Sequence, residues 1–413
     1  MKTTNAFTQG VSLISTILNK MPGINEWRRR FIVETFMLFL SIRGRINFLQ
    51  LARYGKYHES TYRMGFERNF DFLTFNSLLV SQYCGANCIL GFDPTYLDKS
   101  GKHTPGIGYF YSGAAGKYKR GLEISGIAVV DLDQNTAYHL EAIQTPSARK
   151  STLEDGQSIV DHYANILVSR SAQLSQISQI LAVDAYFTKR KFIDPICNKT
   201  DINLVGRLRE DANLRYLYMG RPTGNKGRPK QYAGKINVKQ IDKRRVTKEY
   251  EDEEVRIYAA VVNSVGLKRN VKLCYVEFLN SGGGVNTTKM FFSTDIIMTG
   301  LAILSAYRAR FQMEFNFRDS KQFTGLQNSQ ARSKKKIHFH VNAALTAASI
   351  GKCIQRKGLK RSLRSTYSIS DLTTELFNHN LLKRILSIYP IDPNIKINDN
   401  VIRSVLDYGK IAA

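Results

Sequence analysis

The stretch YRARFQMEFNFRDSK at residues 307–321 places one carboxylate among several cations. At about 100° per residue, offsets of three, seven and fourteen from its first residue bring four of its side chains into a sector of roughly 60° on one α-helix. A carboxylate in such a row can hold a metal ion, and its cations can hold phosphates. The alternative interpretation is an exposed helix face with ordinary salt bridges. The residues concerned are Tyr307, Arg310, Glu314 and Lys321, with Arg318 on the same face.

Two further acids each end a run of apolar residues. Asp93 follows the run at residues 88–92, and Asp184 follows the run at residues 180–183. We interpret both runs as buried β-strands, whose carboxyl ends are where open α/β sheets place their sites. A carboxylate there is costly to bury unless it is paired or bound to metal. Each acid alone could be a turn residue, but together with Glu314 they predict an oxygen cage for two Mg²⁺ ions.

The charge of the chain indicates a polyanionic partner. There are 60 Lys and Arg residues against 34 Asp and Glu, which gives a formal charge of +26. A folded protein bears such self-repulsion most readily when it binds a polyanion such as double-stranded DNA. No run approaches the ~20 apolar residues that span a bilayer, and the N-terminus lacks the pattern of a signal peptide. The sequence therefore predicts a cytoplasmic, nucleoid-associated protein with no membrane contact.

The first 80 residues carry helical patterns. Residues 45–54 and 59–64 are separated by a short turn that contains Gly55, which is helix-turn-helix spacing. The second helix would present Arg63 to a DNA groove. The alternative interpretation is an ordinary helical hairpin.

Strand patterns begin near residue 88. Further strands are predicted over residues 122–132, 137–145, 180–184 and 204–208, with a helix over 157–177. The pattern is typical of an α/β fold with a mixed sheet.

A second β-rich region is predicted over residues 211–293. Its strands fall at residues 255–263, 270–278 and 287–293. Before them, the segment at residues 220–230 carries Gly-Arg-Pro twice, with Arg221, Arg228 and Lys230. Such a basic loop can lie in a DNA minor groove, and the alternative is a solvated loop.

With these motifs the chain resembles the DDE transposases of bacterial insertion sequences, in the insertion-sequence-four type branch with a Tyr-Arg-Glu-Lys signature. Asp93 and Asp184 resemble the first two acids of that family, and Glu314 resembles the third. The signature is completed by Tyr307, Arg310 and Lys321. The resemblance covers roughly residues 85 to 350.

The resemblance implies a ribonuclease-H-like catalytic core interrupted by a β-rich insertion. Helical regions would flank the core on both sides. The expected organisation is a helical DNA-binding domain at 1–80, the first part of the core at 81–210, the insertion at 211–293, the second part of the core at 294–350, and a basic, helical region at 351–413.

The resemblance also implies an activity. Such transposases use the three acids and two Mg²⁺ ions, with Mn²⁺ as a substitute, to cleave DNA. Two copies act on paired ends that carry terminal inverted repeats, and the freed 3′-OH attacks target DNA. Tyr307, Arg310 and Lys321 would grip phosphates beside the cleaved bond. Two alternatives stay open: a nuclease of the same fold without strand transfer, and a catalytically inactive DNA-binding protein.

This branch often passes through a DNA hairpin with a flipped base stacked on an aromatic residue of the insertion. That residue is usually a tryptophan, but the only tryptophan here is Trp27. The insertion offers other aromatic residues, and we expect that one of Phe291 and Phe292, which lie closest along the chain to the Glu314 helix, could replace it.

Overall fold

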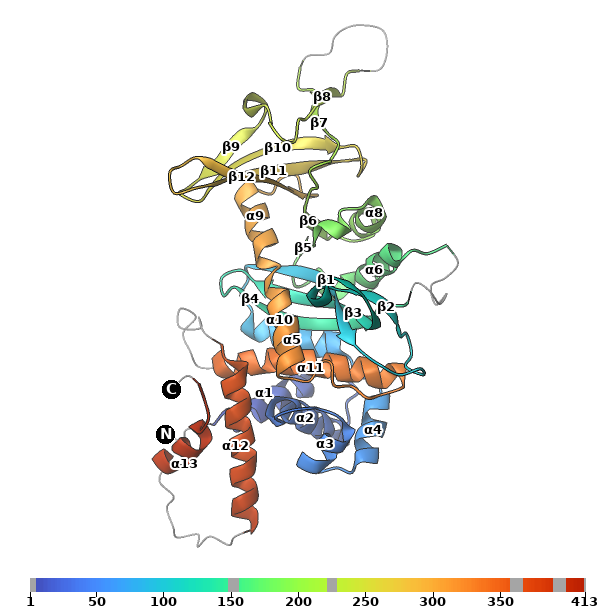
Figure 1. The fold of residues 1–413 in the computed structure, drawn as a ribbon, viewed down its shortest axis with the longest axis vertical. Coiled ribbons are helices and arrows are strands. Elements are labelled where there is room, and N and C mark those ends of the chain that lie inside the picture. The colour runs from blue at the N-terminus through green and yellow to red at the C-terminus, as the bar shows by residue number, and fades with distance from the viewer. Residues whose placement is uncertain (1–4, 148–155, 221–228, 357–366, 389–398, 412–413) are drawn as a thin grey trace.

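The computed structural model describes residues 5–147, 156–220, 229–356, 367–388 and 399–411. The molecule is elongated, with helices at one end, a sheet with flanking helices in the middle, and a second β-rich tier at the other end (Figure 1). Among the described residues, no helix is both long and apolar enough to cross a membrane.

The N-terminal tier is helical, as the sequence predicts. Its first three helices each begin after an asparagine whose side chain accepts a hydrogen bond from a backbone N–H three residues later, which satisfies a donor that the helix leaves free. The helices are α1 (Ala6–Lys20), α2 (Glu26–Ser41), α3 (Phe48–Tyr54), α4 (Glu59–Glu67) and α5 (Phe72–Tyr83).

The middle tier is a mixed sheet. The central strand β1 pairs antiparallel with β3 and parallel with β5, which in turn pairs parallel with β6. The strands are β1 (Cys88–Asp98), β2 (Gly108–Ser112), β3 (Lys117–Asp131), β4 (Thr136–Gln144), β5 (Ile180–Ala182) and β6 (Asn203–Arg207), and the helices between β4 and β6 are α6 (Ile159–Val168), α7 (Ser171–Leu174) and α8 (Arg190–Lys199).

The second β-rich tier continues the same sheet, because β12 pairs antiparallel with β6. The helix α9 packs against strands of this tier, and α10 packs against the middle tier. The elements are β7 (Leu214–Leu217), β8 (Tyr232–Lys235), β9 (Thr247–Glu251), β10 (Val255–Ser264), β11 (Arg269–Leu279), β12 (Val285–Ser293), α9 (Gly300–Ala309) and α10 (Gln312–Gln322).

The C-terminal part is helical and holds the tiers together. The helix α11 (Lys334–Arg356) is buried along most of its length, between the N-terminal helices and β4. One continuous apolar core therefore joins the N-terminal tier to the sheet. The chain continues with α12 (Ile369–Ile388) and α13 (Asp399–Asp407); most of the basic stretch after Arg356 lies outside the described residues.

Most predicted strands are confirmed, and three predictions were wrong in detail. The strand before Asp93 does not end there but runs to Asp98. The helix predicted over 157–177 is interrupted at residues 169–170. The single helix predicted over 307–321 is two helices, which meet at residues 310–311.

The prediction that Phe291 or Phe292 is free to stack on a flipped base is also wrong. Both rings are buried, with exposed fractions of 2% and 0%. Phe291 packs on Tyr307 of α9 with ring centroids 4.8 Å apart. Phe292 lies against Gly206 on the other face of the strand. Both faces of β12 are covered here, so both phenylalanines belong to the core.

Replacement of Phe292 by alanine is expected to lower the free energy of unfolding by about 3–5 kcal/mol, because it leaves a cavity in a closed core. Phe311→Ala is the matched control: that ring is 48% exposed, so its loss should change stability by no more than about 0.5 kcal/mol. Urea denaturation measures both. A cost for Phe292→Ala as small as that of the control would mean that the ring is not part of the core.

Candidate active site

The register of two parallel strands brings Asp93 and Asp184 together. Gly91 in β1 lies opposite Ala182 in β5, and each acid follows two residues later. Side chains alternate along a strand, so two acids at the same offset from a parallel pair leave it at the same level and on the same side. Asp184 follows the end of its strand, as predicted, whereas Asp93 lies in mid-strand, opposite Gly126 of β3.

The break between α9 and α10 separates residues that the sequence placed on one helix. Arg310 and Phe311 keep helical dihedral angles, but their carbonyls accept from Met313 and Glu314, three residues on, at 3.0 Å each. The helix α9 packs against strands of the second β-rich tier, and α10 packs against β1, β3 and β4. Tyr307 and Glu314 thus approach the site from two helices.

Two glycines let α10 sit close to the sheet. A Cβ at Gly91 would lie 2.3 Å from the sulfur of Met313, and a Cβ at Gly126 would lie 2.7 Å from the ring of Phe317. Met313 and Phe317 flank Glu314 on α10, so this close approach sets the height of Glu314 above β1. Sequence reasoning missed both glycines. The available signal was a glycine inside an apolar strand, two residues before the acid.

Ion pairs and a hydrogen bond join the three acids to Arg310 and Tyr307. Arg310 Nη1 lies 3.7 Å from Asp93 Oδ2, and Nη2 lies 3.3 Å from Glu314 Oε1. The Tyr307 hydroxyl donates to Asp184 Oδ1 at 3.4 Å. The Arg310 side chain is 10% exposed, and its Nε has no hydrogen-bond partner among the described residues. The guanidinium therefore bridges two acids, and its Nε–H remains available to donate a hydrogen bond.

The position of Asp93 is electrostatically costly. Burial raises the pKa of its carboxyl to about 7; Arg310 opposes the increase, and the charges of Glu314 and Asp184 add to it. Near neutral pH the folded protein therefore holds a proton on Asp93 that an unfolded chain would have lost. The site carries more negative charge than Arg310 alone balances.

Asp93→Asn is expected to stabilise the fold above about pH 7, in EDTA, by about 1 kcal/mol or more. Because the folded pKa lies above the unfolded value, the wild-type protein loses stability as pH rises from about 4 to 7. Asparagine does not titrate and removes that loss. Thermal unfolding at pH 4 and pH 8 measures the effect. If the difference in stability between variant and wild type is the same at pH 4 and pH 8, the raised pKa of Asp93 is contradicted.

The remaining candidate cations lie in several places. Lys321 Nζ donates to Thr95 Oγ1 at 2.8 Å, and burial lowers the pKa of this lysine. Thr95 follows Asp93 by two residues, so Lys321 lies along the same face of β1. Arg318 is instead exposed, pairs with Asp319 at 3.0 Å and stacks on Phe315.

The other predicted DNA contacts lie on different parts of the fold from the three acids. Arg63 lies on α4, where its Nε donates to Glu59 at 2.9 Å. Lys230 lies in the second β-rich tier, 5.0 Å above the ring of Tyr218. Arg221 and Arg228 lie outside the described residues.

The three acids fit a divalent metal ion in their chemistry. Carboxylate oxygens are the ligands that Mg²⁺ prefers, and a bound cation would offset the burial and the neighbouring negative charges that raise the pKa of Asp93. Within the described ranges, no group of three His, Cys, Asp or Glu side chains is already gathered as a metal cage. Asp93 and Glu314 instead share Arg310, so their side chains would have to turn to a metal.

Carboxylates and cations are thus gathered beside β1 and β5 of the mixed sheet. The family model of the transposase DDE domain matches residues 97–350, more than half of the chain. The chain therefore belongs to the DDE transposase family. The matched range begins just after Asp93 and contains Asp184 and Glu314. No curated protein matches the chain.

Membership carries general expectations that agree with the fold. The DDE domain has a ribonuclease-H-like core, and the mixed sheet of β1–β6 has the matching α/β character. Enzymes of this family cleave DNA and generally use divalent metal ions.

Proposed function

We propose that this protein is an insertion-sequence transposase of the Tyr-Arg-Glu-Lys signature branch. It would bind transposon ends, cleave them and join them to target DNA. The observation that carries the proposal is the convergence of three acids: the strand register aligns Asp93 with Asp184, and Arg310 links Asp93 to Glu314. An exposed helix face with ordinary salt bridges would require neither this strand register nor an arginine shared between the strand and the helix.

In this proposal Asp93, Asp184 and Glu314 hold two Mg²⁺ ions. Bound there, the ions would supply an activated water and stabilise the leaving oxygen. Tyr307 orients Asp184 through its hydroxyl, which burial and the charge of Asp184 keep protonated by raising the pKa of the phenol. Arg310 has the planar fork that suits a phosphate, and it lies between two of the acids.

The wider DNA contacts follow from the charge of the chain. A formal charge of +26 suits a duplex with terminal inverted repeats and a target duplex. The helix-turn-helix spacing of α3 and α4 is retained in the structure and supports end recognition by Arg63. We infer a homodimer on paired ends, acting at the nucleoid, by analogy with the branch.

A metal exchange experiment tests the proposed activity. End-labelled DNA from the flanks of this gene is incubated with the protein in Mg²⁺, Mn²⁺, Ca²⁺ or EDTA. We expect strand cleavage with Mg²⁺ and Mn²⁺. With Ca²⁺ we expect binding without cleavage, because the ion accepts similar ligands at longer distances and with looser geometry. Cleavage in EDTA would contradict the assignment of the three acids as metal ligands.

A further inference from the structure

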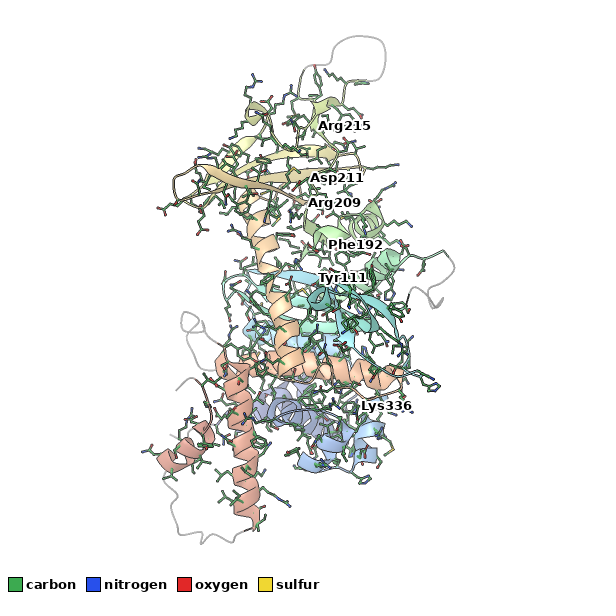
Figure 2. All side chains as sticks on the ribbon, in the orientation of Figure 1. Tyr111, Phe192, Arg209, Asp211, Arg215 and Lys336 are labelled. Carbon is green, nitrogen blue, oxygen red and sulfur yellow. The ribbon has the colours of Figure 1, made fainter. Side chains whose placement is uncertain are left out.

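A pocket of about 1010 Å³ lies where the N-terminal helices meet the loops that follow β1 and α10. Its described lining comes from three segments far apart in the chain: two arginines around α3 and α4, residues 98–104, and residues 327–333 with Lys336. Figure 2 labels Lys336 where α11 begins, beside the N-terminal helices. We call this feature the basic pocket.

The basic pocket carries a strong excess of positive charge. Its described lining contains a single acid, Asp98, and that acid already pairs with Lys119 at 2.9 Å. Cations from all three segments face it. They are Arg45, Arg63, Lys99, Lys102, Arg332 and Lys336.

Half of these cations are held in place, and half are free. Arg63 is bound by Glu59, and Lys336 lies 3.0 Å from Glu67. Lys99 donates to a backbone carbonyl of the facing loop. The three others are exposed, and no ion pair within the described ranges involves them. These free cations are Arg45, Lys102 and Arg332.

The lining favours the backbone of a duplex over a single strand. Sites for single-stranded nucleic acid stack bases on aromatic rings, and the described lining contains no Phe, Tyr or Trp. Besides its cations and Asp98, it offers mainly neutral polar side chains such as Ser100, Thr104 and Asn328. Such groups are the usual partners of duplex phosphates.

The basic pocket is connected to the active site along β1. Asp93 belongs to the site and Asp98 to the pocket rim, and both lie on this strand. At a rise of about 3.3 Å per residue the separation is roughly 16 Å. Phosphates of one strand follow each other at about 3.4 Å along a duplex axis. Lys321, bound to Thr95, lies between the two ends.

We propose that the basic pocket binds the phosphate backbone of duplex DNA about five nucleotides from the cleaved bond. The DNA would then run along β1, from Arg310 past Lys321 to the pocket. The distance from the cleaved bond rests on the proposed function. The binding of duplex DNA by the pocket does not.

The test removes the three free cations together, as Arg45→Gln, Lys102→Gln and Arg332→Gln in one protein. The matched control replaces three exposed lysines elsewhere, at Lys20, Lys199 and Lys268. Binding of a random-sequence duplex is measured over a range of salt concentrations. Each lost phosphate contact reduces the slope of log K against log salt by about 0.9. We expect the slope of the pocket variant to fall by about 2 to 3 and that of the control to stay unchanged.

Circular dichroism checks that both variants are folded, which the exposure of all six side chains favours. Equal slopes in pocket variant and control would overturn the proposal. So would a single strand that binds more tightly than the duplex through the same residues. If the salt slope falls in the pocket variant but the wild-type protein cuts no DNA, the basic pocket binds duplex DNA and the transposase assignment is wrong. If the wild type cleaves DNA but the salt slope of the pocket variant is unchanged, only the proposal that the basic pocket binds duplex DNA is wrong.

Discussion

Asp184→Asn and Glu314→Gln are each expected to lower the rate of DNA cleavage by about 10³-fold or more. Each change keeps the shape of the side chain and removes one negative charge from the site. A metal ion that is lost or misplaced gives up several kcal/mol of transition-state stabilisation, and about 4 kcal/mol is a factor of 10³.

Duplex binding should be nearly unchanged in both variants, since the cations that attract DNA remain. The measurement is cleavage of end-labelled DNA at saturating protein, with binding followed separately by a mobility shift. Asp211→Asn is a suitable control, because that acid is 74% exposed and pairs only with the exposed Arg209 among the ion pairs of the described residues. A loss of less than about tenfold in either site variant would mean that its acid does not hold a catalytic metal.

Arg310→Ala is expected to reduce cleavage by about 10² to 10³-fold, the usual cost of removing one group that stabilises a developing charge. The guanidinium is nearly buried and is shared by Asp93 and Glu314. Its loss also removes the charge that lowers the pKa of Asp93, so that carboxyl should stay protonated to higher pH. Activity of the variant should therefore recover partly as pH rises above 7.

Arg308→Ala is the matched control, because Arg308 is an exposed cation two residues earlier on α9. Affinity for duplex DNA should fall to a similar, small extent in both variants, whereas cleavage should fall only in Arg310→Ala. Arg310→Lys should recover part of the rate, since lysine keeps the charge and loses the planar fork. Parallel losses of binding and cleavage in Arg310→Ala would mark Arg310 as a general anchor for DNA.

The three acids can be recognised in the sequence, but their approach to one another in space cannot. Apolar runs before Asp93 and Asp184 are visible because buried strands need them. The pairing of Gly91 with Ala182, which aligns the two acids, is a long-range relation with no local signature. For the same reason the continuation of β1 beyond Asp93 was missed: residues 94–98 are held by antiparallel pairing with β3.

The break between α9 and α10 was missed because residues 300–322 contain no helix breaker after Gly300. The two helices divide where packing divides, with α9 against the second β-rich tier and α10 against the middle tier. Tertiary contacts here override helical propensity. A uniform 100° period therefore placed Arg318 beside Arg310, although the structure shows it paired with Asp319 in solvent.

Burial on two faces was also invisible in the sequence. Alternation along β12 indicates that neighbouring side chains point to opposite sides, but it does not show whether each side is covered. Tyr307 covers Phe291, and Phe292 packs against Gly206 on the opposite face. The short strands β7, β8 and β9 escaped notice because charged or small residues interrupt each of them and leave no apolar run.

A joining assay distinguishes a transposase from a nuclease. DNA ending in the sequences that flank this gene is mixed with a target plasmid, Mg²⁺ and either wild-type protein or Glu314→Gln, and the products are sequenced across their junctions. We expect that the wild type joins the 3′ ends of the flanking DNA covalently to the plasmid and that the variant forms no junctions. Cleaved ends that never join would identify a nuclease instead. Junctions formed equally well by Glu314→Gln would contradict the convergence of Asp93, Asp184 and Glu314 as the catalytic site.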